Sequence, residues 1–286
     1  MARSFAIIGG DMRQSRLARL LLQDGHTVYT WALECGCAAA ETRGESMEET
    51  AARARCVIWP VPMLNKEGAL NVTGPAVTGA LALRMLRSDQ IAAGGRIPLS
   101  LIRQAEEGGI DLVDYTARED FAIANAVPTA EGALHLAIEQ TETTLHASRC
   151  LIIGYGRIGK ALARSLGAIG ARVTVSARRV EDFMWCEAWG YPHMETGALD
   201  GRLAEFDIVF NTAPHMVLGD GRLRELKAGC LVIDLASAPG GVDFAAAKRR
   251  GVNCHWALSL PGKTAPETAA AILRDTIYHI LDERDG

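Results

Sequence analysis

Short apolar runs alternate with helix-like stretches along most of the chain. In the first part, Leu17, Leu20 and Leu21 fall on one face of a helix that we predict over Arg13–Gln23. The apolar runs that predict strands in this part are Phe5–Gly9, Thr27–Trp31, Cys56–Val61 and Ile110–Tyr115. Strands that alternate with helices are typical of a parallel sheet covered by helices. The segment 33–55 gives no clear pattern.

The same alternation restarts after a long helix-like stretch that runs to about Leu145. We expect this helix to begin at Pro128 or Thr129, because proline suits the first helical turn and a threonine hydroxyl caps it. A final helix is predicted over Pro266–Leu281. The later strands are predicted at Cys150–Ile153, Arg172–Ser176, Ile208–Asn211, Leu231–Leu235 and Asn253–Ala257.

These elements predict an α/β protein with two doubly wound, Rossmann-like domains joined by a long helix. We expect an N-terminal substrate domain over residues 1–127, a connecting helix over 128–147 and a nucleotide-binding domain over 148–265. The C-terminal helix, 266–286, is expected to pack back on the first domain.

The composition narrows the classes of protein that remain. The chain has 286 residues, 49% of them hydrophobic, and a formal net charge of −4, which gives no basic surface for nucleic acid. No apolar run reaches the roughly 18 residues that a transmembrane helix needs, so we expect no membrane insertion and a cytoplasmic location. The seven cysteines form no C-x-x-C pair, and Cys35 and Cys37 lack a second pair at zinc-site spacing, so we expect no metal.

A glycine-rich turn follows the predicted strand Cys150–Ile153 and opens a helix. Gly154 makes the tight turn, Gly156 lets the backbone approach a pyrophosphate, and Gly159 lets helix and strand pack closely. The pyrophosphate then lies at the positive end of the helix. We therefore predict a dinucleotide site formed by Gly154, Tyr155, Gly156, Arg157, Ile158 and Gly159.

The end of the next strand indicates which dinucleotide is bound. An acidic residue at this position holds the ribose 2′-hydroxyl of NAD. Here the position is taken by Ser176, and Arg178 and Arg179 follow it. A hydroxyl and forked guanidinium groups suit a 2′-phosphate, so we expect NADP rather than NAD.

Two later strand ends carry small and polar residues. In doubly wound sheets the carboxyl ends of the strands face the ligand crevice. We therefore expect these residues to line the nicotinamide side of the cofactor site: Asn211, Thr212 and Ala213 after one strand, and Asp234, Leu235 and Ala236 at the other.

A late nucleotide-binding domain in a two-domain chain is similar to the formate/glycerate dehydrogenase-like architecture. Enzymes of that plan reduce a carbonyl with an Arg, Glu and His trio. Here Ser237–Pro239 occupies the place expected for the Arg, Pro261–Gly262 that expected for the His, and Asp243 is the one acid from residue 235 to 266. Carbonyl reduction is therefore disfavoured.

Four blocks of the chain resemble the family of dipicolinate synthase A subunits from spore-forming bacteria. The blocks are Ile8–Gln14, Asn125–Gly132, Asp234–Phe244 and Leu260–Ala269. The chain departs from the family over 33–55, and Glu267 stands where that family is expected to have a basic residue. The resemblance implies NADP-dependent oxidation of dihydrodipicolinate to dipicolinate for sporulation. It also implies a partner, a flavoprotein-like B subunit, and we expect a homo-oligomer in the cytoplasm of the mother cell.

The remaining candidate residues suit a dicarboxylate substrate. Arg13 and Gln14 begin the first predicted helix, where the Arg can grip a carboxylate bidentately, and Lys263 is a further carboxylate ligand. Asn125 and Thr129 are expected to hydrogen-bond the second carboxylate, with Glu131 as the catalytic base. Arg13 alternatively is an exposed helix residue, and Glu131 alternatively only stabilises its helix.

Two other functions remain open at this point. One is another NAD(P)-dependent dehydrogenase that acts on a 2-keto or cyclic dicarboxylate. The other is a non-catalytic nucleotide-binding subunit whose partner carries the chemistry.

Overall fold

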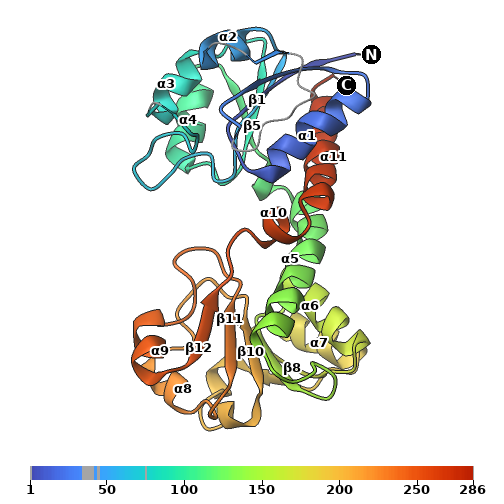
Figure 1. The fold of residues 1–286 in the computed structure, drawn as a ribbon, viewed down its shortest axis with the longest axis vertical. Helices are drawn as coiled ribbons and strands as arrows, with labels where there is room; N and C mark the ends of the chain where they lie inside the picture. The colour runs from blue at the N-terminus through green and yellow to red at the C-terminus, as the bar shows by residue number, and fades with distance from the viewer. Residues whose placement is uncertain (1, 34–41, 44–45, 75, 286) are drawn as a thin grey trace. The chain divides into compact units, whose positions relative to one another are not determined.

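The chain folds into two α/β units, shown in Figure 1. The computed structural model describes residues 2–33, 42–43, 46–74 and 76–285. Unit 1 comprises Met1–Asn125 with Ala265–Gly286, and unit 2 comprises Ala126–Thr264. Cys35 and Cys37 lie outside the described residues.

Unit 1 is built on a six-stranded parallel sheet in the order β3-β2-β1-β4-β5-β6. The strands are β1 (Ser4–Ile8), β2 (Thr27–Trp31), β3 (Thr42–Arg43), β4 (Cys56–Ile58), β5 (Ile91–Gly94) and β6 (Asp111–Asp114). The chain moves outward from β1 to β3 and then returns to β4 on the other side of β1. This reversal is the switch point at which doubly wound sheets bind ligands.

Helices cover both faces of this sheet, because successive strand residues point to opposite sides. Phe5 and Ile7 pack into one hydrophobic cluster, whereas Ala6 and Ile8 pack into another. The helices of unit 1 are α1 (Met12–Gln23), α2 (Met47–Ala52), α3 (Gly79–Arg84), α4 (Leu99–Glu107), the short 3-10 turn η1 (Tyr115–Ala117) and α11 (Pro266–Asp285). Figure 1 shows α11 beside α1, so the C-terminal helix packs on unit 1.

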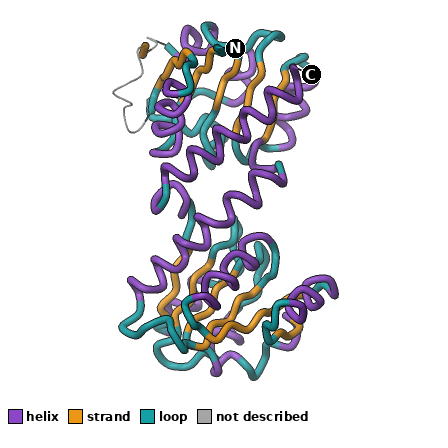
Figure 2. Tube along the Cα trace, turned by 90° about the vertical axis from the view of Figure 1, so that its right-hand side faces the viewer, coloured by secondary structure: helices purple, strands orange, loops and turns teal. Residues whose placement is uncertain are grey.

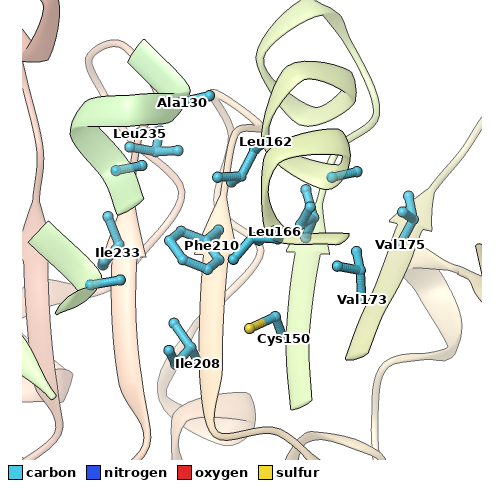
Figure 3. Packing of buried hydrophobic residues seen from close by; sticks show 14 of the residues in the cluster. Ala130, Cys150, Leu162, Leu166, Val173, Val175, Ile208, Phe210, Ile233 and Leu235 are labelled. Carbon is cyan, nitrogen blue, oxygen red and sulfur yellow. The ribbon is translucent and has the colours of Figure 1, made fainter. Parts of the chain in front are cut away.

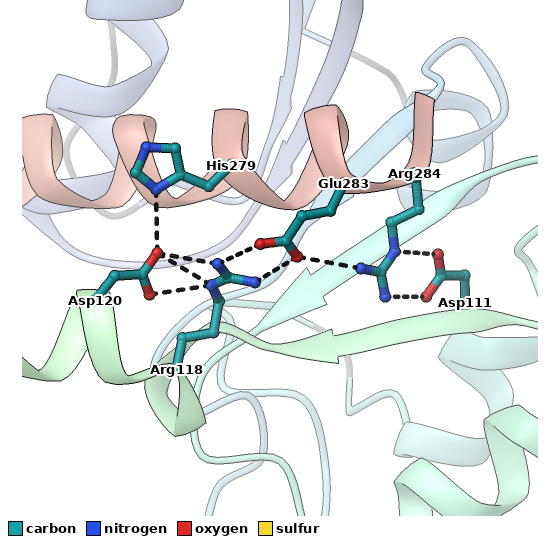
Figure 4. Close-up of polar contacts among 6 residues, drawn as sticks. All are labelled: Asp111, Arg118, Asp120, His279, Glu283 and Arg284. Atoms are coloured by element: carbon teal, nitrogen blue, oxygen red, sulfur yellow. Dashed lines mark hydrogen bonds and ion pairs between the residues drawn. The ribbon is translucent and has the colours of Figure 1, made fainter. Parts of the chain in front are cut away.

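An ion-pair network fastens α11 to the edge of this sheet (Figure 4). The guanidinium of Arg118 lies between two carboxylates, 3.0 Å from Asp120 and 2.8 Å from Glu283. His279 Nδ1 lies 3.1 Å from Asp120, and Arg284 lies 2.8 Å from Asp111 of the edge strand β6. The network therefore joins α11 to β6 and to the segment after it.

Unit 2 repeats the same sheet plan, with the strand order β12-β11-β10-β7-β8-β9 and every pair parallel. Its switch point lies between β7 and β10. The strands are β7 (Arg149–Ile153), β8 (Arg172–Ala177), β9 (His193–Glu195), β10 (Ile208–Asn211), β11 (Leu231–Asp234) and β12 (Asn253–Trp256). Both units are thus doubly wound and Rossmann-like, as the sequence predicts.

The core of unit 2 forms where helices pack on one face of this sheet (Figures 2 and 3). Phe210 of β10 is fully buried beneath Ala130 and Leu162, which come from different helices. The helices and 3-10 turns of this unit are α6 (Arg157–Ala168), α7 (Val180–Ala188), η2 (Thr196–Ala198), η3 (Leu203–Glu205), α8 (Asp220–Arg224), α9 (Phe244–Arg250) and α10 (Leu260–Thr264), together with the later part of α5 (Glu119–Gln140).

The helix α5 differs from the expected connecting helix at both ends. It begins at Glu119, so Pro128 lies inside it and Thr129 does not cap its start. Proline lacks the N–H that would bond to the fourth residue before it, but the rest of the helix continues past this one missing bond. Acidic residues in the first turn, Glu119 and Asp120, provide the start signal instead. The expected boundaries of 128 and 147 are therefore wrong for this helix.

Candidate functional site

The fingerprint turn joins β7 to α6 in a conformation that requires glycine. Gly154 has a φ of +94°, which side-chain-bearing residues rarely adopt, and a Cβ there would overlap the hydroxyl of Thr212. A Cβ on Gly159 would overlap the carbonyl oxygen of Gly154. The two glycines therefore let the turn close tightly against the first turn of α6.

The start of α6 is open to an anion. Gly156 is its N-cap and has no side chain to accept from the first N–H groups of this twelve-residue helix. A Cβ built on Gly156 would meet no atom within 4 Å, so the backbone here is approachable. The uncapped N–H groups and the helix dipole together favour a phosphate at this position. These residues fit the pyrophosphate of a dinucleotide.

A cavity of about 270 Å³ lies at the carboxyl ends of β7, β8 and β10. This is the place at which doubly wound sheets bind nucleotides. Its walls contain most of the expected cofactor ligands, and the whole lining is Gly154, Tyr155, Gly156, Arg157, Ile158, Ala177, Arg178, Arg179, Asp182, Thr196, Thr212, Ala213, Pro214 and His215. The structure thus brings the fingerprint, the arginine pair and the segment after β10 together around one space.

Ser176 does not take the place that the sequence predicts. The strand β8 continues to Ala177, which occupies the strand-end position in the cavity wall. Ser176 is fully buried, and its hydroxyl lies 2.8 Å from the hydroxyl of Thr196. The expected hydroxyl ligand for a 2′-phosphate is therefore wrong, because one more residue in the strand turns Ser176 into the interior.

The two arginines that follow β8 differ in their partners. Arg179 donates from Nε and Nη2 to the carboxylate of Asp182, both at 3.0 Å. Asp182 is 5% exposed and lines the cavity, although no sequence motif identifies it. Arg178 is exposed in the same wall and forms no ion pair with any described residue. Arg178 is therefore the cation with donors available at this end of the cavity.

The polar residues at the ends of β10 and β11 form a buried network behind the cavity. Asn211 and Asp234 are fully buried, and the Asn211 amide donates to the Asp234 carboxylate at 2.8 Å. Leu235 and Ala236 are also buried, and none of these four residues lines the cavity. The expected direct cofactor contact of these residues is wrong, since their side chains point into the interior, whereas Thr212 and Ala213 do line the cavity.

Tyr155 occupies the variable position of the fingerprint but points into the core. It is 1% exposed, and its ring lies 6.2 Å from that of Trp189 and 6.4 Å from that of Tyr191. The ammonium of Lys160 lies 5.8 Å from the Tyr155 ring centroid. Burial raises the pKa of the Tyr155 hydroxyl, so this group stays protonated at neutral pH. Its ring anchors the fingerprint turn against the helix α7 side of the unit.

In unit 1, Arg13 and Gln14 lie in the first turn of α1, directly after β1. Asp11 is the N-cap of this helix, and Gln14 Oε1 accepts from the Asp11 N–H at 3.1 Å. Arg13 pairs bidentately with Asp11, at 3.0 Å from Nε and 2.8 Å from Nη2. Burial opposes ionisation of Asp11, but hydrogen bonds from Arg13 outweigh it and hold its pKa below the ordinary value. Gln14 Nε2 is buried without a hydrogen-bond partner among the described residues.

The other candidate substrate residues lie on helices. Asn125, Thr129 and Glu131 belong to α5, and Lys263 belongs to the short helix α10. Within unit 2, α10 packs closely on α5, because a Cβ on Gly132 would lie 2.9 Å from atoms of Leu260 and Thr264. Glu131 and Lys263 are exposed, Thr129 is buried, and none of the four lines the cavity at the fingerprint.

No metal centre is found among the residues that the structure describes: no three His, Cys, Asp or Glu side chains gather there as ligands. In the same part of the chain, none of the helices is long and apolar enough to cross a membrane.

Comparison with known protein families gives two matches. Residues 4–116 match the N-terminal domain of the dipicolinate synthase A subunit. Residues 123–242 match the NAD-binding domain of D-isomer-specific 2-hydroxyacid dehydrogenases, which covers the fingerprint and the cavity.

Full-length relatives extend these matches to nearly the whole chain. The A subunit of dipicolinate synthase from Bacillus subtilis (strain 168) is 32% identical over 97% of this chain and 95% of its own. The crystal structure of the dipicolinate synthase A subunit from Bacillus halodurans superposes with a TM-score of 0.86 at 28% identity, covering 98% of this chain and 97% of that one. The crystal structure of the Bacillus subtilis protein gives a TM-score of 0.84 at 30% identity, over 99% and 97%.

Proposed function

Since this chain belongs to the family of dipicolinate synthase A subunits and is an NAD(P)-dependent oxidoreductase, we propose that it oxidises dihydrodipicolinate to dipicolinate with NADP. The observation that carries the proposal is the match over 97% of the chain to a protein of that name. The fingerprint cavity in unit 2 supports the cofactor part of the proposal, since its walls suit a dinucleotide.

The preference for NADP rests on the rim of this cavity. The pyrophosphate lies at the uncapped start of α6, next to Gly156. Arg178 stands at the end of β8, where the adenosine ribose lies in this fold, and its guanidinium suits a 2′-phosphate. When bound, the nicotinamide ring supplies a hydride acceptor.

The proposed reaction explains why a carbonyl-polarising trio is absent from the sequence. Dihydrodipicolinate loses a hydride from one saturated ring carbon and a proton from another, and the product ring is aromatic. No carbonyl needs polarising in this step. The protein must instead bind two carboxylates, hold the ring still and accept one proton.

Charged and polar residues at three places in the chain are proposed for these tasks. Arg13 and Gln14 bind one carboxylate: Arg13 uses Nε and Nη2 for Asp11 and keeps its Nη1 donors, and Gln14 keeps its Nε2 donors. Lys263 is proposed as a further carboxylate ligand, because its exposed ammonium is a compact positive charge.

The remaining proposed residues lie on α5. Asn125 and Thr129 supply hydrogen-bonding groups for the second carboxylate. Glu131 is proposed as the base that accepts the proton, because it is an exposed carboxylate near the start of the segment shared with the family.

The proposal includes an assembly, because the relatives are named as one subunit of a synthase. The expected partner is a flavoprotein-like B subunit, and the expected setting is the cytoplasm of the mother cell of a sporulating bacterium. A homo-oligomer of this chain is proposed as well.

A coupled assay tests this function. The purified chain is mixed with freshly prepared dihydrodipicolinate and either NADP or NAD, with and without the B subunit. NADPH absorbance and terbium luminescence of dipicolinate are followed together. Both signals are expected to rise with NADP and to rise more slowly with NAD. Nucleotide binding without dipicolinate formation in any arm would leave the oxidoreductase fold and overturn the substrate.

A further inference from the structure

The cavity wall contains an acid that the cofactor preference does not explain. Asp182 lies in the first turn of α7, close to the end of β8. Its side chain is 7% exposed, so few water molecules solvate the carboxylate. Its partner Arg179 is a solvent-facing residue, with 67% of the side chain exposed.

The exposures show which member of the pair depends on the other. An exposed arginine needs no counter-ion, because water solvates it. A nearly buried carboxylate does need one, since an uncompensated buried charge is costly. Both oxygens of Asp182 receive a hydrogen bond from Arg179 at 3.0 Å, which is the strong bidentate geometry of an Arg–carboxylate pair. The pair thus neutralises an acid in the wall of the nucleotide cavity.

We propose that Asp182 is a latent NAD-selecting acid, which Arg179 masks so that the cavity accepts NADP. The inference rests on the proposed function, because it assumes that a dinucleotide occupies this cavity. Arg179 is then a specificity-determining residue through its effect on Asp182, and Arg178 is the residue that contacts the 2′-phosphate.

The sign of the effect follows from charge. An acid near the end of the second strand accepts a hydrogen bond from a ribose 2′-hydroxyl and repels a 2′-phosphate. Arg178, Arg179 and Asp182 together carry a net charge of +1, which favours the phosphate. Without Arg179 the three positions carry no net charge, and a bare carboxylate faces the cavity. The site then loses attraction for NADP and gains an acceptor for NAD.

Equilibrium binding to wild type and three variants tests this inference. NADPH and NADH are titrated, with bound-nucleotide fluorescence as the readout, into wild type, Arg179→Ala, the double variant Arg179→Ala/Asp182→Asn, and Arg178→Ala. Arg179→Ala should raise the Kd for NADPH by about tenfold or more, the worth of one charge-assisted hydrogen bond, and lower the Kd for NADH by roughly threefold. The double variant should lose the gain in NADH affinity.

Arg178→Ala is the matched control, since this neighbouring arginine has no acid to mask. It should weaken NADPH binding and leave NADH binding unchanged. Arg179→Gln, which keeps a polar side chain of similar reach, should repeat the result of Arg179→Ala and guards against loss of folding in the alanine variant.

Two results would overturn the inference, and they are distinguishable. If Arg179→Ala and Arg179→Gln weaken NADPH binding but do not tighten NADH binding, Asp182 is no latent selector, while the proposed cofactor site stands. If wild type binds neither nucleotide, the proposed cofactor site fails, and the inference fails with it.

Discussion

The side-chain amide of Asn211 donates a 2.8 Å hydrogen bond to the carboxylate of Asp234, joining the carboxyl ends of the neighbouring strands β10 and β11. Asp234 also accepts from the backbone N–H groups of Ala236 and Gly241, at 3.0 and 2.8 Å. The Asn211 side chain in turn accepts from the N–H of Ala213, which lines the cavity. Two buried polar residues therefore hold the loops that shape one side of the nucleotide site.

The substitution Asp234→Asn should loosen both loops. An amide presents one donating group where the carboxylate accepted, so a buried N–H is left without a partner. We expect a loss of about 2–4 kcal/mol in the free energy of unfolding, measured by urea denaturation, and weaker NADPH binding. Asp220→Asn is the control, because Asp220 is an exposed acid paired with Arg250, and its loss should cost less than about 1 kcal/mol. Equal costs for the two variants would contradict the account of the network.

Two glycines of the fingerprint should respond differently to alanine. A Cβ on Gly156 meets no protein atom within 4 Å, so Gly156→Ala should fold with nearly the stability of wild type. It should still lose most nucleotide affinity, because the methyl group occupies the space of the pyrophosphate. Gly159→Ala should instead lower Tm sharply, since its Cβ overlaps the Gly154 carbonyl oxygen. Thermal unfolding and NADPH titration measure both effects, and normal nucleotide binding by Gly156→Ala would refute the assigned phosphate position.

The network at α11 gives a pH-dependent prediction. Hydrogen bonds from Arg118 hold the pKa of Asp120 below its ordinary value of 3.8, with burial opposing and His279 adding to the effect. A lowered pKa means that ionised Asp120 stabilises the fold above the unfolded-state pKa and that this stabilisation is lost as the pH falls. Asp120→Asn should therefore cost about 1 kcal/mol or less at pH 7, given its partial exposure, and the gap to wild type should close in acid.

Urea denaturation at a series of pH values measures that gap. Glu139→Gln serves as its control, because Glu139 is an exposed acid of α5 with no ion pair to any described residue. A gap between wild type and Asp120→Asn that stays constant from neutral pH into acid would show that the Asp120 charge is not its source.

The role proposed for Arg13 predicts a separation of kinetic constants. Lysine keeps the positive charge but cannot form a bidentate pair, so Arg13→Lys should raise KM for the dicarboxylate by about tenfold. NADPH affinity should not change, since Arg13 lies in unit 1 and the fingerprint cavity in unit 2. Arg16→Lys on the same helix is the control, because Arg16 pairs with Glu267 at 3.0 Å. An unchanged KM for Arg13→Lys would remove Arg13 from the substrate site.

Most strands were predictable from the sequence because their apolar runs are rich in β-branched residues. The runs at Thr27–Trp31 and Ile208–Asn211 coincide with β2 and β10. The strand β5 was not predicted, since its Ile91, Ala92, Ala93 and Gly94 are fully buried and give no alternation of polar and apolar residues. The early start of α5 was missed because Pro128 resembles a helix start, although it lies in the interior.

The site was predictable where backbone geometry dictates the residue. Glycines are required at the fingerprint turn, and the structure places that turn in the cavity wall. The directions of the Ser176 and Asp234 side chains were not predictable, because they depend on where a strand ends and on which loop supplies N–H groups. Asp182 was missed for a similar reason, since its place in the wall follows from the turn between β8 and α7.

The central claim is that this chain removes a hydride from a dihydropyridine dicarboxylate. The most direct measurement uses dihydrodipicolinate labelled with deuterium at the saturated ring carbons, NADP and the complete assembly, with both products analysed by mass spectrometry. We expect dipicolinate and reduced cofactor in equal amounts, with one deuterium on the reduced cofactor. Dipicolinate formed without deuterium on the cofactor would contradict the account.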